Sequence, residues 1–592
     1  MATLLGFLRR RVGRKGGVLS IITISILGLS LLYLMPRKNV TPDLPIDSGR
    51  RPVVTLRQGT YMGIELDVGY PQVLEAFRGV PYGQSTAGDR RFMPPLPVNE
   101  SEEEFDASTF GDKCPAGPEV FGSQSEDCLN VNIYRPKGRN PRLKLPVAVA
   151  FHGGAFNFGA GDSSKNVANF VAWSAEPMVA VAFNYRVGAF GFLSSSLMAK
   201  NGLLNAGLKD QALLLEWVQE NIAAFGGDPE NVTIMGSSAG AHSIGHHLLH
   251  NTDKPPLFHR AILESGAATA RAVYSYSNPL HEKQFRDFLA KLDLDKTSEK
   301  DLLPALRKVS TAVLKKASEF IFNKYNPSVR WPFQPVIDGK GGMIAVSPIS
   351  AWKAGKWHKV PILTGFNTNE GAMFVPKNLD TGSQFKDFFR ELLPGLREMD
   401  LETLNEVYPD PTTDPLSPYK ETRSGLGYQF KRLEQAYGTF AYIAPVRQTA
   451  HYAASLQNSN GNGGSAPVYL YHFAASSSVK GGADHGSHIP WVSYMPERRD
   501  KGETVDEISG SMYAYWSSFV LTGDPNVVPG RWRDRMRWPE YKVEEARVLT
   551  FGEGNDEVAG GGNKGVALQV KDDGFANEES EYWWKRTELF EF

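Results

Sequence analysis

The chain has 592 residues, of which 41% are hydrophobic and 11% aromatic, and its formal net charge at pH 7 is -1. This is ample material for a large core, although the length exceeds that of a typical single domain. The near-neutral charge gives no electrostatic basis for a polyanionic partner, and we predict no nucleic-acid role.

The N-terminal segment predicts a membrane anchor. Basic residues at 9–15 precede an uncharged, mainly apolar run from Gly16 to Met35, which the sequence Pro-Arg-Lys ends. About twenty such residues in a helix span about 30 Å, the thickness of a bilayer core. The apolar part of a cleaved signal peptide is shorter, about 7 to 15 residues, and ends in a small-residue cleavage motif that is missing here.

The charge balance around this run sets its expected orientation. More basic charge precedes the run than follows it, so the positive-inside rule keeps the tail in the cytosol and sends the rest across the membrane. A secreted protein, released after signal cleavage, is the alternative. We therefore predict four segments: a basic cytosolic tail at 1–16, a transmembrane signal anchor at 17–35, a polar stem at 36–51, and one lumenal or extracellular folded domain at 52–592.

The apolar pattern after residue 52 predicts a large, mostly parallel sheet. Short antiparallel strands are expected at 53–56, 60–68 and 73–77, joined by Gly and Pro turns. Later apolar runs lie at 145–151, 179–184, 232–235, 260–264, 361–364 and 468–472. Helical patterns such as 208–224 separate most of them, which is typical of an α/β sheet wrapped by helices on both faces.

Other stretches are expected to lie outside this alternation. Charged, amphipathic sequence at 271–330 and 377–450 predicts helical insertions that form either the walls of a gorge or a cap. Gly-rich and Asn-rich stretches at 457–466 and 552–565 predict surface loops.

The stretch 225–241, FGGDPENVTIMGSSAGA, predicts a strand, a sharp turn and a helix, with Ser238 at the tip of the turn. Gly236 and Gly240 flank the serine because a Cβ at either place would collide with the neighbouring strand or helix. The turn lifts the hydroxyl above the sheet, at the positive end of a helix dipole. Ser238 is therefore the candidate nucleophile.

A serine hydroxyl needs a base to take its proton, and the base needs a carboxylate that orients it and stabilises its cation. Ligands of parallel sheets lie beyond the carboxyl ends of the strands, so the residues after the predicted strands are the candidates. Glu370 follows the strand at 361–364, and His485 follows the strand at 468–472. The chain order of serine, acid and histidine fits a catalytic triad on this type of turn.

A Gly-rich turn, HGGAF at 152–156, follows the strand at 145–151. Backbone N–H groups of such a turn can stabilise the oxyanion of a tetrahedral intermediate, because no side chain blocks their approach. The two cysteines, Cys114 and Cys128, close a short loop if they are oxidised, and they are two buried thiols if the domain is cytosolic.

From 225 to 240 the sequence resembles the serine motif of the type-B carboxylesterase and lipase family, which includes the cholinesterases. The resemblance extends over about residues 52–540 through FRGVPY at 77–82, SEDCL at 125–129, NYRVG at 184–188, PVIDG at 335–339 and TGDPN at 522–526. It implies the α/β-hydrolase fold and a serine hydrolase that cleaves carboxylic esters through an acyl-enzyme. It also implies a small-molecule ester as substrate and no cofactor.

The resemblance further implies roles for single residues. Ser238, Glu370 and His485 would form the triad, and Cys114 would pair with Cys128. The oxyanion hole would be the N–H groups of Gly154, Ala155 and Ala239. Candidates for the substrate pocket are Phe156, Trp331, Phe333, Met373 and Phe374.

Several positions depart from the family pattern, among them Ala155, Asn130 and two positions near the triad. Glu usually precedes the nucleophile in the family, whereas this chain has Ser237, and His488 stands where the family often has an acid. The loop between the cysteines holds only Phe121 as an aromatic residue, where cholinesterases have a Trp that holds a quaternary ammonium group. We therefore predict that choline esters are not preferred over neutral esters.

Competing functions have less support in the residues. His242, His246 and His250 share one helical face, but no carboxylate ligand accompanies them and their span is too long for one tetrahedral ion, so we predict no metal site. A non-catalytic adhesion or binding protein of the same family would not need the complete triad. A lipase acting on acylglycerols is the nearer alternative, and the sequence leaves the choice between esterase and lipase, and the oligomeric state, open.

Overall fold

The computed structural model describes residues 51–592 except 118–121, 139–141, 163–164, 272, 456–465, 477–481, 531 and 592. The predicted tail, the predicted signal anchor and the stem up to residue 50 lie outside the described residues. Within the part of the chain that is described, none of the helices combines the length and hydropathy that crossing a bilayer requires.

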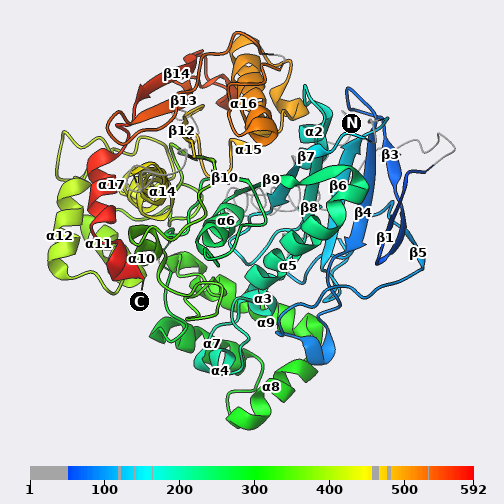
Figure 1. Ribbon diagram of the computed structural model, residues 1–592. Coiled ribbons are helices and arrows are strands. Elements are labelled where there is room, and N and C mark those ends of the chain that lie inside the picture. Colours follow the sequence, from blue (N-terminus) through cyan, green and yellow to red (C-terminus); the bar gives the residue numbers. More distant parts are fainter. Residues whose placement is uncertain are drawn as a thin grey trace, which may run out of the picture. The chain divides into compact units, whose positions relative to one another are not determined.

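The strands are β1 (Val53–Leu56), β2 (Gly59–Met62), β3 (Ile64–Leu66), β4 (Leu74–Pro81), β5 (Glu104–Asp106), β6 (Asn130–Pro136), β7 (Leu145–Phe151), β8 (Val179–Phe183), β9 (Gly227–Ser237), β10 (Arg260–Glu264), β11 (Ile362–Asn367), β12 (Val468–Phe473), β13 (Arg547–Glu553) and β14 (Val566–Asp572). In the described residues, eleven of them form one sheet in the order β14-β13-β12-β11-β10-β9-β7-β8-β6-β4-β3 (Figure 1). The strands from β13 to β8 in this order are parallel, whereas both edges pair antiparallel. The predicted fold class, a mostly parallel sheet preceded by antiparallel strands, is confirmed.

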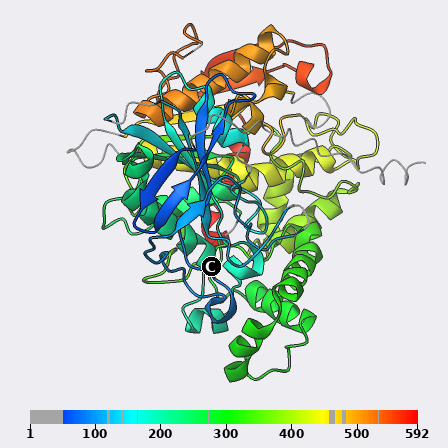
Figure 2. The same ribbon diagram turned by 90° about the vertical axis from the view of Figure 1, so that its right-hand side faces the viewer.

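The helices are α2 (Lys165–Ala172), α3 (Gly188–Phe192), α4 (Ser196–Lys200), α5 (Ala206–Asn221), α6 (Ala239–Leu249), α7 (Pro279–Lys291), α8 (Glu299–Lys308), α9 (Thr311–Tyr325), α10 (Pro348–Lys353), α11 (Gly382–Leu392), α12 (Glu398–Val407), α13 (Phe430–Gly438), α14 (Ala444–Ser455), α15 (Ile489–Val492), α16 (Glu503–Thr522) and α17 (Asn577–Trp584). Helices α5, α6 and α14 cover the face of the sheet turned to the viewer in Figure 1. Helices α7 to α9 gather at the opposite end of the folded domain from α16 (Figure 2).

The predicted helical insertions are confirmed, because α7 to α9 lie within 271–330, α11 to α13 lie within 377–450, and α14 begins within 377–450 and ends at Ser455. The strand predicted at 60–68 is instead divided at Gly63. A Cβ at Gly63 would lie 2.5 Å from the carbonyl oxygen of Ala76, so the chain bends there. As a result β2 joins a separate small sheet, β1-β2-β5, while β3 joins the edge of the large one.

Three strands of the large sheet, β6, β13 and β14, were not predicted. The Gly-rich loop predicted at 552–565 connects two of them, β13 and β14, and the loop predicted at 457–466 lies outside the described residues except for its last residue. The predicted disulfide between Cys114 and Cys128 is confirmed. Both cysteines are buried, with their Cα atoms 4.9 Å apart.

Candidate active site

The turn between β9 and α6 has the backbone of a nucleophile elbow. Ser238 has φ 59° and ψ -127°, a conformation that a residue with a Cβ adopts only where its surroundings impose it. Its N–H donates to the carbonyl of Glu264, 3.0 Å away. A Cβ at Gly236 would lie 2.8 Å from the carbonyl oxygen of Phe151, and one at Gly240 only 2.2 Å from the same oxygen. The predicted need for glycine on both sides of the serine is confirmed.

Two other predicted residues meet at the carboxyl ends of β11 and β12. Glu370 is fully buried, and its Oε2 lies 2.5 Å from Nδ1 of His485. The other carboxylate oxygen accepts a hydrogen bond of 2.7 Å from the N–H of Asn367. The Asn367 side chain in turn donates to the carbonyl of Asp484 at 2.7 Å, which connects the acid loop to the histidine loop. The carboxylate therefore fixes the orientation of the imidazole.

The second nitrogen of this histidine is not engaged by any of the described residues. His485 Nε2 is buried and has no hydrogen-bond partner among the described residues, which include the Ser238 hydroxyl. Catalytic hydrogen bonds of this kind are often long in free enzymes and shorten when substrate binds. With Nδ1 engaged by Glu370, Nε2 is the nitrogen left to accept a proton.

The Gly-rich turn lies against the nucleophile. A Cβ at Gly153 would lie 3.2 Å from Cβ of Ser238 and 2.9 Å from the carbonyl of Ser237, so only glycine permits this approach. Gly154 and Ala155 follow with φ of 111° and 54°.

The peptide after Ala155 is held in place through its carbonyl oxygen. This oxygen accepts hydrogen bonds from Asn157 Nδ2 at 2.8 Å and from Gln334 Nε2 at 2.9 Å. The hydrogen bonds of the described residues include none donated by the N–H of Gly154 or Ala155. These two predicted donors are therefore unengaged.

Aromatic rings surround the histidine. The Tyr442 ring lies 4.4 Å from the His485 ring and that of Phe374 lies 5.0 Å from it, measured between centroids. Tyr442 comes from a π-helical turn, Thr439–Ile443, between α13 and α14, and such turns are frequent at functional sites. No motif or periodic pattern in the sequence points to this residue, because its place depends on the backbone of the turn.

The five predicted pocket residues occupy different environments. Phe374 contacts the histidine, and the Trp331 ring lies 5.2 Å from Phe374. Phe156 and Phe333 are buried and pack on other aromatic rings, at Phe192 and Phe288. The Met373 side chain, by contrast, is 56% exposed, whereas Phe374 is half-buried and the other three are buried.

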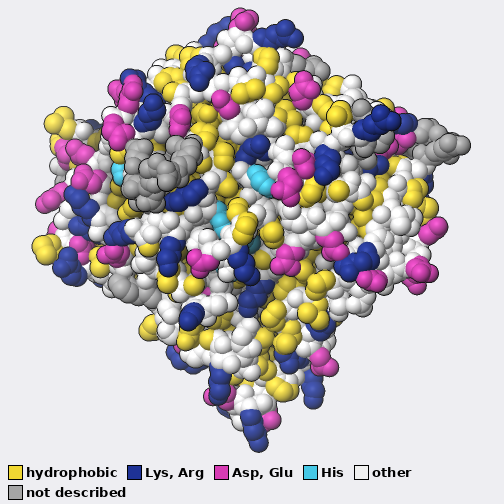
Figure 3. All heavy atoms as spheres, in the orientation of Figure 1, with side chains coloured by type: hydrophobic (Ala, Val, Ile, Leu, Met, Phe, Trp, Pro, Cys, Tyr) yellow, Lys and Arg dark blue, Asp and Glu magenta, His cyan; other side chains and the backbone are white. Residues whose placement is uncertain are grey.

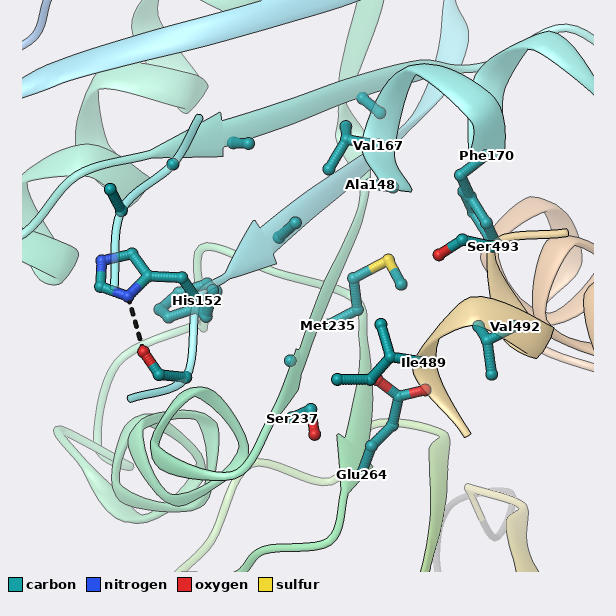
Figure 4. Close-up of a pocket in the computed structure, with 18 residues that line it drawn as sticks. Ala148, His152, Val167, Phe170, Met235, Ser237, Glu264, Ile489, Val492 and Ser493 are labelled. Carbon is teal, nitrogen blue, oxygen red and sulfur yellow. Dashed lines mark hydrogen bonds between the residues drawn. The ribbon is translucent and has the colours of Figure 1, made fainter. Parts of the chain in front are cut away.

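A cavity of about 160 Å³ lies beside the elbow. Most of its lining is apolar, from β7, β8, α2 and α15, and the polar groups include His152, Ser237 and Glu264. Figure 4 shows the Glu264 carboxyl group next to Ile489, with the Ser237 hydroxyl on the same side of the cavity. On the face of the molecule seen in Figure 3, histidine and hydrophobic side chains lie together near the centre, among charges of both signs.

The acid in this cavity, Glu264, is a buried residue. Burial raises the pKa of Glu264 to about 8, although Trp516 Nε1 donates a hydrogen bond of 2.8 Å to it. His488 Nε2 lies 3.8 Å from the same carboxyl oxygen, and burial lowers the pKa of His488 to about 3. Both groups are therefore neutral at pH 7. Glu264 ends a predicted strand, so the rule of the carboxyl ends could have found it.

Comparison with known proteins places this site in a family. Residues 50–570 match the model of the carboxylesterase family. The chain is 36% identical to secreted lipase 4 of Gibberella zeae, over 81% of this chain and 84% of that protein. It is 31% identical to acetylcholinesterase of Electrophorus electricus, over 83% of this chain and 84% of that protein. It is also 31% identical to an inactive carboxylesterase-like protein, VdtD, of Byssochlamys spectabilis, over 85% of this chain and 90% of that protein.

Solved structures give the same result. EstA of Aspergillus niger superposes with a TM-score of 0.74 at 26% identity, covering 92% of this chain and 100% of the other. A PNB esterase superposes with a TM-score of 0.70 at 27% identity, covering 90% of this chain and 100% of the other. The folded domain thus has the α/β-hydrolase fold, and the chain belongs to the carboxylesterase family.

Proposed function

We propose that this carboxylic ester hydrolase works through an acyl-enzyme on Ser238, with His485 as general base and Glu370 as the carboxylate that orients it. Nε2 of the histidine takes the hydroxyl proton as Oγ attacks the ester carbonyl, and then returns it to the leaving alcohol. Water repeats the sequence on the acyl-enzyme. The observation that carries the proposal is the contact of 2.5 Å between the buried Glu370 and Nδ1 of His485.

The oxyanion would form against the Gly-rich turn. We assign its donors to the N–H groups of Gly154 and Ala155, joined by that of Ala239 at the start of α6. Donors fixed before the reaction need no reorganisation when charge develops, and removing one from such a site costs about 3 kcal/mol of transition-state stabilisation.

Replacing the nucleophile tests the mechanism. Ser238→Ala should lower kcat for a soluble neutral ester by about 10⁴-fold or more and abolish labelling by an organophosphonate, with an unchanged thermal unfolding midpoint. Ser277→Ala, at an exposed serine before α7, is the matched control and should retain both properties. A Ser238→Ala protein that keeps a tenth of the activity would contradict the mechanism.

Two alternative functions can be distinguished from this proposal by experiment. One relative is described as inactive, and a binding protein of that kind would show no turnover and no labelling. A lipase would prefer emulsified long-chain acylglycerols to soluble short-chain esters. A chain-length series of neutral esters, soluble and emulsified, separates these readings.

We also propose that residues 17–35 anchor the enzyme in a membrane, with residues 1–16 in the cytosol and the catalytic domain lumenal or extracellular. The support is the basic flank and the length of the apolar run. The alternative is secretion after cleavage, and the Gibberella zeae relative is named as secreted.

A further inference from the structure

An arginine lies on the aromatic wall of the candidate site. Arg271 belongs to the loop between β10 and α7, and its guanidinium carbon lies 3.8 Å from the centroid of the Trp331 ring. Its Nη1 donates a long hydrogen bond, 3.4 Å, to Gln334 Oε1. The pKa of His242 is lowered mainly by burial and secondly by the positive charge of Arg271. The His242 ring packs against Tyr442. The guanidinium is thus close to the rings around the catalytic histidine.

The charge of this arginine is not matched by an acid. Three buried arginines each have a carboxylate partner: Arg91 has Glu126 at 2.5 Å, Arg186 has Asp210 at 2.6 Å and Arg447 has Asp573 at 2.9 Å. In the described residues, the Arg271 guanidinium has only a ring face and neutral groups around it, including the amide of Gln334. A partly buried charge without a partner is costly unless a ligand supplies one.

A second guanidinium faces the same small cavity. The cavity has a volume of about 40 Å³, and its polar lining includes Arg271, Tyr274, His281, Arg330 and Gln334. We call it the Arg271–Arg330 niche.

Two residues that line the niche, Arg330 and His281, each have a buried nitrogen with no hydrogen-bond partner among the described residues. Arg330 Nε is buried without a hydrogen-bond partner, and the nearest carboxylate to this arginine is that of Glu391 at 3.7 Å, on a side chain that is 59% exposed. His281 is 5% exposed and its Nε2 also lacks a partner. Burial lowers the pKa of His281 to about 4 and raises that of Tyr274 to about 12, so both are neutral groups that can donate.

These groups fit a carboxylate. Guanidinium groups bind carboxylates through two parallel, charge-assisted hydrogen bonds, and uncharged imidazole and phenol groups can donate to the same oxygens. The niche exceeds the space of a single water molecule and has room for a group of carboxylate size.

The niche is connected to the reacting groups on one side. Gln334, which lines it, donates a hydrogen bond to the carbonyl of Ala155 in the oxyanion turn. Trp331 also lines it and contacts Phe374, which packs on His485. The niche shares no lining residue with the cavity at Glu264, so the two are separate cavities.

We infer that the Arg271–Arg330 niche binds a carboxylate at the far end of the substrate's acyl group, and that half-esters of dicarboxylic acids are preferred substrates. This inference rests on the proposed function of the site. The inference adds a substrate class to the proposed function, namely esters whose acyl half carries a negative charge.

Two matched pairs of esters test this. In the first, the acyl half carries the charge: monomethyl glutarate against methyl 4-carbamoylbutanoate, its neutral amide. In the second, the alcohol half carries it: 4-acetoxybutanoate against 4-acetoxybutanamide. For the first pair, kcat/KM for the anion should exceed that for the amide by about tenfold or more, because a hydrogen bond to a charged group in a desolvated site contributes this much. For the second pair the ratio should be near one.

Substitutions then assign the preference to the niche. R271Q and R330Q should each bring the first ratio close to one, and R271K should keep part of it because the charge remains without the planar fork. R286Q, at an exposed arginine of α7, makes the same change in net charge and should leave the ratio as in the unmodified protein. Thermal unfolding midpoints show which variants are folded. If R271Q does not fold, R330Q and R271K still test whether the niche produces the preference.

The outcomes separate the inference from the proposed function. Three results would overturn the inference but not the proposed function. The protein could cleave neutral esters without preferring an acyl half that carries a carboxylate, it could show the preference only in the second pair, or the first ratio could persist in folded R271Q and R330Q. A protein that cleaves none of the esters and takes no organophosphonate label overturns the proposed function and the inference with it.

Discussion

One buried carboxyl group sets the electrostatics behind the nucleophile. The resemblance to the type-B carboxylesterases predicts an acid directly before the serine, where it could add negative potential beside the nucleophile. Here that position is Ser237, and the nearby acid is Glu264, whose pKa is raised to about 8 by burial. The cavity at the elbow therefore carries no negative charge from this acid at pH 7. Phe121, the aromatic residue noted in the disulfide loop, lies outside the described residues.

This difference predicts how the enzyme responds to substrate charge. At pH 7 the kcat/KM for a choline ester should not exceed that for its uncharged dimethylbutyl isostere. Above pH 8 Glu264 loses its proton, so a negative charge appears in the cavity and the ratio of choline ester to isostere should rise. The measurement is the ratio of kcat/KM for the choline ester to that for the isostere between pH 6.5 and 9. Because the triad acts on both esters in the same way, effects of pH on the triad cancel in this ratio.

A conservative variant identifies the titrating group. Glu264→Gln keeps an acceptor for the Trp516 N–H and should give a ratio that does not change with pH. The other titratable groups near the cavity, His152 and His488, have pKa values lowered to about 4 and about 3, so they are neutral throughout this range. A tenfold preference for choline at pH 7, or a rise that persists in Glu264→Gln, would be evidence against this assignment.

At the scale of an element, the turn between β9 and α6 depends on backbone contact. A Cβ at Gly240 would lie 2.2 Å from the carbonyl oxygen of Phe151, which is backbone and cannot rotate away. Gly240→Ala should therefore displace α6 or β7, destabilise the domain by roughly 1 to 3 kcal/mol, and reduce organophosphonate labelling of Ser238. Urea unfolding and the labelling rate measure the two effects.

A matched glycine controls for the loss of backbone freedom. Gly562 lies in the loop between β13 and β14, where a Cβ would meet nothing within 4 Å. Gly562→Ala should leave both the unfolding midpoint and the labelling rate close to those of the unmodified protein. Equal effects of the two substitutions would show that the close contact with β7 is not what requires glycine at the elbow.

Strand β6 shows why some elements were not predictable. All of its residues are buried, yet Asn130, Asn132 and Arg135 interrupt the apolar pattern that identifies a strand. Their polar groups are satisfied by remote partners: Asn132 bonds the N–H of Gly79, and Arg135 bonds Glu75. A local pattern cannot anticipate such partners. The central parallel strands, by contrast, are continuous apolar runs because both of their faces are covered.

At the scale of the whole molecule, the sequence was sufficient to locate the parallel strands from β7 to β12 and the residues at their carboxyl ends, but not β13. Glu370 and His485 could be found because each follows a recognisable strand. Arg271 and Tyr442 could not, because one follows no motif and the other depends on a π-helical turn in an insertion. The rule of the strand ends located the site, while the walls that select a substrate come from segments without a periodic signal.

The remaining prediction concerns the attachment of the folded domain. If residues 17–35 are an uncleaved anchor, carbonate at high pH should leave the full-length enzyme in the membrane pellet, and protease should reach the catalytic domain only from the lumenal or extracellular side. Replacing Leu29 by Arg places a charge in the middle of the run, at a cost of about 3 kcal/mol for insertion, and should release a fraction of the protein. Exchanging Leu29 for Val keeps the run apolar and serves as the control. Mature protein that begins near residue 36 and accumulates free in the medium would instead establish a cleaved signal.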